Sequence, residues 1–113
     1  MKLSEQEKAD CLHLSAAFKK TFIGPKKSQT NRMLNEWLKL NLGVSIGDKK
    51  MRDYIHYIRC TLQVPVIASK KGYYLAENRQ QMYTYLESLR YRINAQEDII
   101  DSLELTVNNL KVK

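Results

Sequence analysis

Apolar residues recur at helical spacing from the fifth residue onward. The repeating positions are Cys11, Leu14, Phe18 and Phe22, with Leu12 on the flank. Intervals of three and four residues place these side chains on one face of an α-helix. Gly24-Pro25 follows, and proline cannot continue the helical hydrogen-bond ladder. We therefore expect a first amphipathic helix from residue 5 to about residue 21.

The same spacing returns after the Gly24-Pro25 break. Ser28 or Thr30 offers an N-cap, because a short hydroxyl side chain can accept a hydrogen bond from a first-turn N–H group. The apolar stripe that follows consists of Met33, Leu34, Trp37, Leu38, Asn41 and Leu42. Gly43 stands where a helix would end in the left-handed conformation. A second helix is expected between these signals.

A third helix is expected after the short glycine-containing turn of residues 43–47. Asp48 is a good N-cap and would open a helix of about fourteen residues. Its inward face would carry Met51, Ile55, Ile58 and Leu62. The opposite face and its flanks carry Lys49, Lys50, Arg52, Asp53, His56, Tyr57 and Arg59. Two helices joined by a short turn, the second basic and outward-facing, are typical of a helix-turn-helix.

The next stretch has the composition of a β-hairpin. Residues 64–68 and 73–76 are rich in β-branched and aromatic side chains and flank Ser69-Lys70-Lys71-Gly72. Gly72 can supply the positive φ of a short hairpin loop. Pro65 has no N–H group for a ladder, so its strand lies at an edge or starts there. A hairpin this small needs support from the helices, which indicates a wing.

The C-terminal stretch shows heptad periodicity. Its repeating positions alternate spacings of four and three, and all but the polar Gln96 are apolar: Met82, Leu86, Leu89, Ile93, Gln96, Ile100, Leu103, Val107 and Leu110. β-branched residues at position a with mostly Leu at d favour a parallel two-stranded coiled coil, and Arg92 and Glu97 would pair between chains. Two alternatives stay open. Ile99 and Leu105 widen the apolar face, which suits an antiparallel pair or a small bundle, and the helix could also fold back on its own domain.

These elements predict a mainly α fold with an α+β wing. Residues 1–78 would form a winged helix-turn-helix domain, and residues 79–113 a long C-terminal helix that dimerises as a coiled coil. The net charge of +7 lies in the first part: residues 1–78 hold fourteen basic and seven acidic residues, whereas residues 79–113 hold five of each. A concentrated positive field favours a polyanion such as nucleic acid. The alternative is a lysine-rich surface that serves solubility alone.

The expected DNA contacts come from three segments. The third helix would enter a major groove with Lys49, Lys50, Asp53 and His56, and with Tyr57 as a further candidate. Arg52 and Arg59 would bind phosphates, or else tie the helix to the body. The wing tip would contribute Ser69, Lys70 and Lys71. The start of the second helix would bind phosphate through Ser28, Gln29, Thr30, Asn31 and Arg32, and Lys26 and Lys27 would add to the same edge.

The sequence shows no clear pattern of catalytic or metal-binding residues. His56 and Cys60 share a helix face, but Cys11 and His13 are two residues apart and point to different sides of a helix. No phosphate-binding glycine loop or catalytic triad stands out. We expect a protein that is not an enzyme and has no cofactor or metal. No apolar run is long enough for a membrane span. Two lone cysteines and a polar N-terminus favour a reducing cytoplasm, with both thiols buried and inert.

The order of these pieces resembles a type of short winged-helix protein frequent in phages and prophages. The resemblance covers residues 28–95 and is carried by the runs 46–55, 58–59, 65–69, 72–76 and 85–93. In such proteins an Asp-Lys/Arg-x-apolar-Arg helix start precedes an arginine, a Pro-Ile-like strand and a Gly-Tyr-Tyr/Trp strand. The resemblance implies a winged helix-turn-helix DNA-binding protein, encoded by a phage or prophage and acting in the bacterial cytoplasm.

The functional expectation is sequence-specific binding of double-stranded DNA by a homodimer, which would regulate transcription or replication of a phage or mobile element. One alternative is a phage-encoded inhibitor or adaptor that binds a host protein through the same scaffold. Another is an assembly protein driven by the heptad helix alone. A basic, exposed third helix argues against mimicry of DNA, because a mimic presents acidic surfaces.

Overall fold

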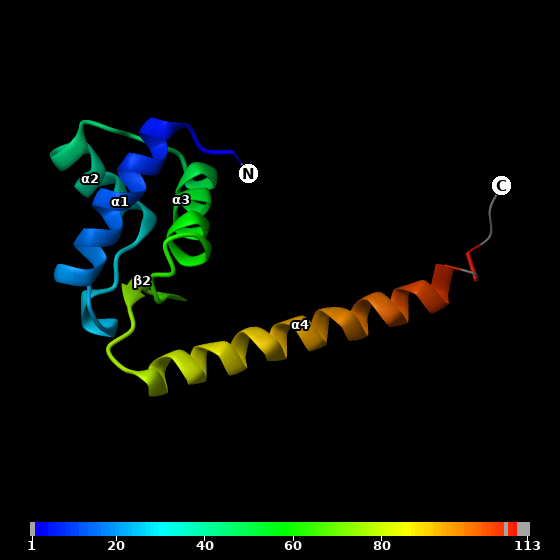
Figure 1. The fold of residues 1–113 in the computed structure, drawn as a ribbon. Helices are drawn as coiled ribbons and strands as arrows, with labels where there is room; N and C mark the ends of the chain where they lie inside the picture. The colour runs from blue at the N-terminus through cyan, green and yellow to red at the C-terminus, as the bar shows by residue number, and fades with distance from the viewer. Residues whose placement is uncertain (1, 108, 111–113) are drawn as a thin grey trace. The chain divides into compact units, whose positions relative to one another are not determined.

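The described part of the protein is mainly helical, with four α-helices and one small antiparallel sheet. The computed structural model describes residues 2–107, 109 and 110. The chain divides into two compact units, residues 1–79 and residues 80–113. Unit 1 contains three helices and the sheet, and unit 2 contains most of the long last helix (Figure 1). No helix in the described part of the chain is long and apolar enough to cross a membrane.

Helix α1 (Glu5–Lys20) forms as the apolar spacing predicts. Its N-cap is Ser4, whose hydroxyl accepts a hydrogen bond from the Glu7 N–H group at 3.1 Å. In return, the Ser4 N–H group donates to Oε1 of Glu7 at 2.8 Å, so that each residue satisfies an otherwise unpaired group of the other. The predicted apolar positions Cys11, Leu14 and Phe18 are fully buried.

Helix α2 (Asn31–Leu42) lies between the two predicted signals. Thr30, one of the two candidates, is the N-cap and accepts from the Met33 N–H group at 3.2 Å. Gly43 ends the helix in the left-handed conformation, at φ 67°. Asn35 then fixes the following turn, because its amide donates to the Ile46 carbonyl at 2.6 Å and its Oδ1 accepts from the Ile46 N–H group at 2.9 Å.

Helix α3 (Asp48–Cys60) differs from the prediction at both ends. Its N-cap is Gly47, so the prediction that Asp48 is the N-cap was wrong by one residue. Asp48 instead lies in the first turn, where its negative charge complements the helix dipole. Leu62 lies beyond the last helical residue and is half-buried, whereas Tyr54, absent from the predicted inward face, is 1% exposed.

The hairpin consists of β1 (Val66–Ser69) and β2 (Gly72–Leu75), paired antiparallel with Ser69 opposite Gly72. Lys70 and Lys71 form the loop, and Gly72 has the expected positive φ, at 122°. Pro65 immediately precedes β1, as its missing N–H group requires. The prediction of a hairpin in this stretch is confirmed.

Two segments of unit 1 hold the hairpin in place. On one side, Gln29 and Tyr73 exchange both backbone hydrogen bonds, at 2.7 and 2.8 Å. Near the other end of β2, the Leu75 N–H group donates to the Phe22 carbonyl at 2.7 Å, and the Leu75 carbonyl accepts from Gly24 at 2.9 Å. Between these contacts the chain makes the short 3-10 helix η1 (Pro25–Lys27). The hairpin is therefore built into the helical body.

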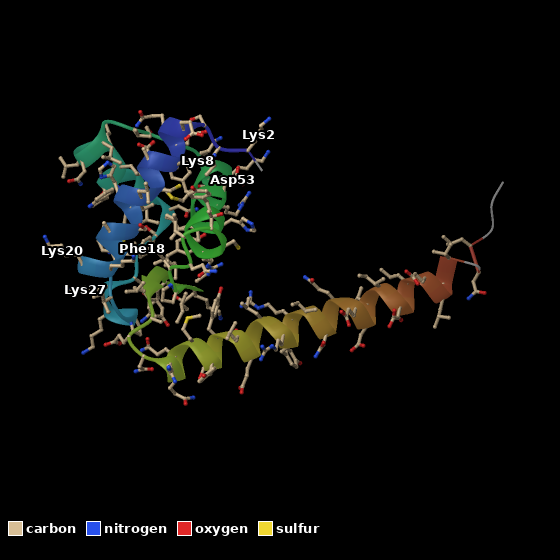
Figure 2. All side chains as sticks on the ribbon, viewed as in Figure 1. Lys2, Lys8, Phe18, Lys20, Lys27 and Asp53 are labelled. Atoms are coloured by element: carbon tan, nitrogen blue, oxygen red, sulfur yellow. The ribbon has the colours of Figure 1, made fainter. Side chains whose placement is uncertain are left out.

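The core of unit 1 lies between α1, α2 and α3. The largest fully buried side chains are Tyr54, Phe18, Leu14, Leu34, Leu38, Met51, Ile58, Val66 and Cys11. Figure 2 shows Phe18 among them on α1. The two benzene rings of Phe18 and Phe22 meet edge to face, with centroids 5.6 Å apart. The core packs the three helices against the base of the hairpin within one compact unit.

Unit 2 is dominated by helix α4 (Arg79–Val107), of 29 residues. None of its residues is buried. Ile93, Ile100 and Leu103 are each more than half exposed. Leu110 lies past the end of the helix, so the predicted heptad run extends one position too far. Met82, Leu86 and Leu89 are half-buried. The helix is about 43 Å long, at about 1.5 Å per residue, and its apolar side chains from Ile93 to Val107 leave a stripe uncovered in the single chain.

Candidate nucleic-acid interface

The outward face of α3 is a row of exposed side chains. Lys49, Arg52, His56 and Cys60 are exposed, and Asp53 is half-exposed. The buried residues Met51, Tyr54, Ile55 and Ile58 lie on the opposite side of the helix. Figure 2 shows Asp53 on α3 at the edge of unit 1. Within the described residues, the ammonium of Lys49 and the guanidinium of Arg52 have no ion-pair partner. Two cations on this face are available to a ligand.

Lys50 lies on the flank of α3 that faces α1. Its Nζ forms an ion pair with Oε2 of Glu7 at 3.0 Å, and its side chain is 37% exposed. The pKa of the Glu7 carboxyl is lowered, first by the hydrogen bond from the Ser4 backbone and then by Lys50. Lys50 is thus partly neutralised within the molecule. It belongs less to the outward face than Lys49 does.

Arg59 lies on the other flank of α3, next to the hairpin. Its Nε donates a hydrogen bond to the Val66 carbonyl at 2.9 Å, and the side chain is half-buried. Of the two roles that the sequence leaves open for Arg59, the contact supports the structural one. This hydrogen bond holds α3 next to β1.

The hairpin tip presents two exposed lysines. The Ser69 hydroxyl donates to the Gly72 carbonyl at 3.0 Å and accepts from the Lys71 N–H group at 3.2 Å. Ser69 therefore shapes the turn, and its hydroxyl is already used in both directions. Lys70 and Lys71 are exposed at its apex. Of the three residues predicted to contact DNA from the tip, only these two lysines carry a charge that can bind an anion.

The predicted phosphate-binding segment before and at the start of α2 uses most of its side chains locally. Ser28 donates to the Pro25 carbonyl at 2.6 Å, and Gln29 to the Lys27 carbonyl at 3.0 Å. Thr30 caps α2. Arg32 pairs on the surface with Glu36 at 3.4 Å. What remains for an anion is the N–H groups of Asn31 and Arg32 in the first turn of the helix, because the Met33 N–H group donates to Thr30.

A shallow depression connects the start of α2 with the hairpin. Its volume is about 280 Å³, and its lining includes Thr30, Asn31, Ser69, Lys70 and Tyr73. The carbonyl oxygen Oδ1 of Asn31 is a buried side-chain atom without a hydrogen-bond partner in the described structure. Two of the three predicted contact segments therefore meet at one place, with Lys70 at its margin.

The cysteine and histidine residues are divided between α1 and α3. No group of three possible ligands occurs among the described residues. Cys11 is buried, and burial raises the pKa of its thiol to about 12. The prediction that both thiols are buried was wrong for Cys60, which is exposed on α3 with its Sγ 4.0 Å from Nδ1 of His56. Position on the helix decides this: four residues after His56, the chain returns to the same outward face.

Sequence reasoning missed contacts that position the interface. Tyr54 donates from its hydroxyl to Oδ2 of Asp10 at 3.1 Å, and both residues are buried. The spacing of Tyr54 from Met51 and Ile58 would have placed it on the inward face. Neither the Lys50–Glu7 pair nor the Gln29–Tyr73 pair has a signal in local spacing, because each joins segments distant in the chain.

Comparison of this chain with family models, with curated protein sequences and with solved structures gave no match.

Proposed function

We propose that this protein is a winged helix-turn-helix protein that binds double-stranded DNA as a homodimer. The observation that carries the proposal is the pairing of two exposed cationic surfaces on one compact unit. Lys49 and Arg52 are exposed on α3, and Lys70 and Lys71 are exposed at the hairpin tip. The Arg59–Val66 hydrogen bond links the two elements that bear them. Two such cationic surfaces can contact the phosphate backbones on the two sides of a DNA groove.

In this proposal α3 is the recognition helix. A major groove about 12 Å wide admits an α-helix, and side chains on its outward face then meet the base edges. Asp53 and His56 are the candidates for base contacts, and Lys49 and Arg52 contact bases or phosphates. Lys50 contributes less, because Glu7 already holds it. The first-turn N–H groups of α2 and the lysines of the hairpin bind phosphates on either side.

The homodimer forms through α4 as a two-stranded coiled coil. Apolar residues at heptad positions a and d, which are exposed in the single chain from Ile93 onward, become covered by the same residues of a second copy. Arg92 at g and Glu97 at the following e provide an attractive pair between parallel chains. The two recognition helices of the dimer then bind two symmetry-related half-sites on the DNA. The role that fits is regulation of transcription or replication in a phage or mobile element.

The test is a titration of a labelled duplex of about 30 base pairs with the full chain, followed by fluorescence anisotropy at several salt concentrations. Affinity should fall steeply as salt rises, because bound phosphates release counterions. Lys49→Glu should weaken binding about tenfold or more. Lys39→Glu is the matched control, since Lys39 is an exposed lysine on α2 and the charge change is the same. It should bind within about threefold of the original protein.

Two results would remove the proposal. In the first, neither a random duplex nor genomic fragments bind the original protein at low salt. In the second, the Lys49 and Lys39 variants lose affinity equally, so that only net charge matters.

A further inference from the structure

A second basic surface lies at the end of α1 and in η1. It consists of Lys19, Lys20, Lys26 and Lys27, all exposed, and is called here the α1–η1 patch. No acidic residue occurs between residues 19 and 35 of the sequence. Within the described part of the chain, none of the four lysines forms an ion pair. Four free charges therefore lie within nine positions.

Backbone hydrogen bonds hold the patch in a fixed shape. After Lys20, the N–H groups of Thr21 and Phe22 both donate to the Ala17 carbonyl, at 2.8 and 3.2 Å. Gly24 turns the chain at φ 87°, and its carbonyl accepts from the Lys27 N–H group at 3.0 Å. The two lysine pairs thus flank one tight turn. It is anchored to β2 through the bonds of Phe22 and Gly24 to Leu75.

One carboxylate reduces the charge of the patch. A side chain added at Gly24 would come within 2.7 Å of the Glu77 carboxyl, so Glu77 lies against the turn. Counting Glu77, the patch keeps a formal charge of +3. A surplus of this size on a short turn favours an extended anion over a single carboxylate.

The patch faces away from the proposed recognition helix. Figure 2 shows Lys20 and Lys27 at one edge of unit 1 and Asp53 at the other, with the buried Phe18 between them. A duplex lying against the outward face of α3 is separated from the patch by α1 and the core. The sequence predicts that Lys26 and Lys27 add to the phosphate contacts at the start of α2, whereas the proposal that follows assigns them to a second duplex.

We propose that the α1–η1 patch binds the phosphate backbone of a second DNA duplex without reading its bases, so that the protein bridges two duplexes. Lysine ammonium groups act as point charges and suit phosphate contacts. Single-stranded nucleic acid would need exposed aromatic rings for stacking, but the one aromatic residue of this segment, Phe22, is 7% exposed. Binding at the patch stands without the proposed function, whereas bridging rests on it.

The experiment compares four full-length proteins. They are the original chain, Lys26→Glu/Lys27→Glu, Lys49→Glu/Arg52→Glu, and the combination of all four changes. Each is titrated at low salt with a duplex of about 12 base pairs, which at about 3.4 Å per base pair spans only about one face of unit 1. Analytical ultracentrifugation then gives the number of duplexes bound per protomer. Because both double variants carry the same change in charge, each is the control of the other.

The original chain should bind about two such duplexes per protomer, each double variant about one, and the combination none. If Lys26→Glu/Lys27→Glu binds as many duplexes as the original chain, the patch proposal is overturned. The same holds if Lys49→Glu/Arg52→Glu binds none, because the patch then has no affinity of its own. Failure of the proposed function looks different: duplex binding survives Lys49→Glu/Arg52→Glu unchanged and is abolished by Lys26→Glu/Lys27→Glu.

A second arm addresses another polyanionic partner. Vesicles containing phosphatidylserine are tested for binding to the original chain and to Lys26→Glu/Lys27→Glu, because clustered lysines also attract anionic lipid. The patch proposal expects duplex binding to fall in this variant by about tenfold or more at the second site. A loss confined to vesicle binding, with both duplexes retained, would assign the patch to a lipid surface and overturn the proposal.

Discussion

The hydroxyl of Tyr54 on α3 donates a hydrogen bond to Oδ2 of Asp10 on α1 at 3.1 Å, and both side chains are buried. The other carboxylate oxygen of Asp10 accepts from the Gln6 amide at 3.3 Å. A buried acidic residue without partners is costly, so this pair fixes which part of α1 lies against α3. The outward direction of the proposed recognition helix depends on this contact between two helices.

Tyr54→Phe should therefore lower the free energy of unfolding by about 1–3 kcal/mol. The change keeps the buried ring but removes the donor, which leaves an oxygen of Asp10 unsatisfied. Urea unfolding followed by circular dichroism measures the loss. Tyr74→Phe is the control, because Tyr74 lies on β2, is only half-buried and has no hydrogen bond to another side chain among the described residues. Equal stability of the two variants would contradict a structural role of the Asp10 contact.

Stability should also fall at alkaline pH. Burial raises the pKa of the Cys11 thiol from 9.0 to about 12, and burial followed by the Asp10 hydrogen bond raises the pKa of Tyr54. Both groups hold their protons more tightly when folded. Their contribution is complete below the pKa of the unfolded chain and is lost as the pH rises towards the folded values.

The free energy of unfolding should thus decrease between about pH 9 and pH 12. Cys11→Ala removes one titrating group, so its stability, although lower, should depend less steeply on pH over this interval. Urea midpoints measured at half-unit steps of pH give the slopes. Parallel curves for the two proteins would show that Cys11 is not the group responsible.

Local spacing predicts most of the fold of unit 1. The helices emerge because apolar residues repeat every three or four positions, and Thr30 and Gly43 are strong end signals. The start of α3 was misplaced because aspartate is favoured both as N-cap and in the first turn. Gly47, with no side chain to accept a bond, gives no comparable signal.

The candidate interface is predictable only at its centre. Each residue turns an α-helix by about 100°, so residues opposite the apolar face, such as Lys49 and His56, are reliably exposed. Lys50 and Arg59 lie on the two flanks, where exposure depends on what packs alongside. Lys50 forms an ion pair with Glu7, and Arg59 donates a hydrogen bond to the Val66 carbonyl. Local periodicity cannot predict these contacts, because each joins two different elements of the fold.

The hairpin leaves no room for a side chain at Gly72. A Cβ atom there would collide with the backbone of Gln29 and lie 2.8 Å from the Thr30 nitrogen, and φ is 122°. Gly72→Ala should lower the free energy of unfolding by about 2 kcal/mol or more. The backbone atoms that a new Cβ would meet cannot move aside easily, and alanine is strained in this conformation. It should also weaken duplex binding, since the pairing of Gln29 with Tyr73 positions the lysines of the tip.

Gly43→Ala is the matched control for Gly72→Ala. Gly43 also has a positive φ, of 67°, but nothing lies within 4 Å of an added Cβ. Its substitution should lower the free energy of unfolding by only about 1 kcal/mol, because the left-handed backbone conformation is the only unfavourable contribution. Urea unfolding distinguishes the two. If Gly72→Ala were no more damaging than Gly43→Ala, the close approach of β2 to the start of α2 would not be a structural constraint.

From Ile93 onward, the apolar residues of α4 lie exposed in the single chain, whereas Met82, Leu86 and Leu89 are half-buried. Ile93 and Ile100 occupy a positions of the heptads and are each 53% exposed. Ile93→Glu/Ile100→Glu should give a monomer in sedimentation equilibrium, because glutamates facing each other across a seam repel and are desolvated. The original chain should sediment as a dimer at micromolar concentration.

Tyr91 and Leu105 provide a control that also separates the possible assemblies. Both are at f positions, 75% and 74% exposed, and should remain in water in a two-stranded coil. Tyr91→Glu/Leu105→Glu carries the same added charge and should leave the dimer intact. If this variant dissociates as well, α4 uses a wider apolar face, as in a bundle. If Ile93→Glu/Ile100→Glu keeps the mass of the original chain, self-association does not run through the a and d positions.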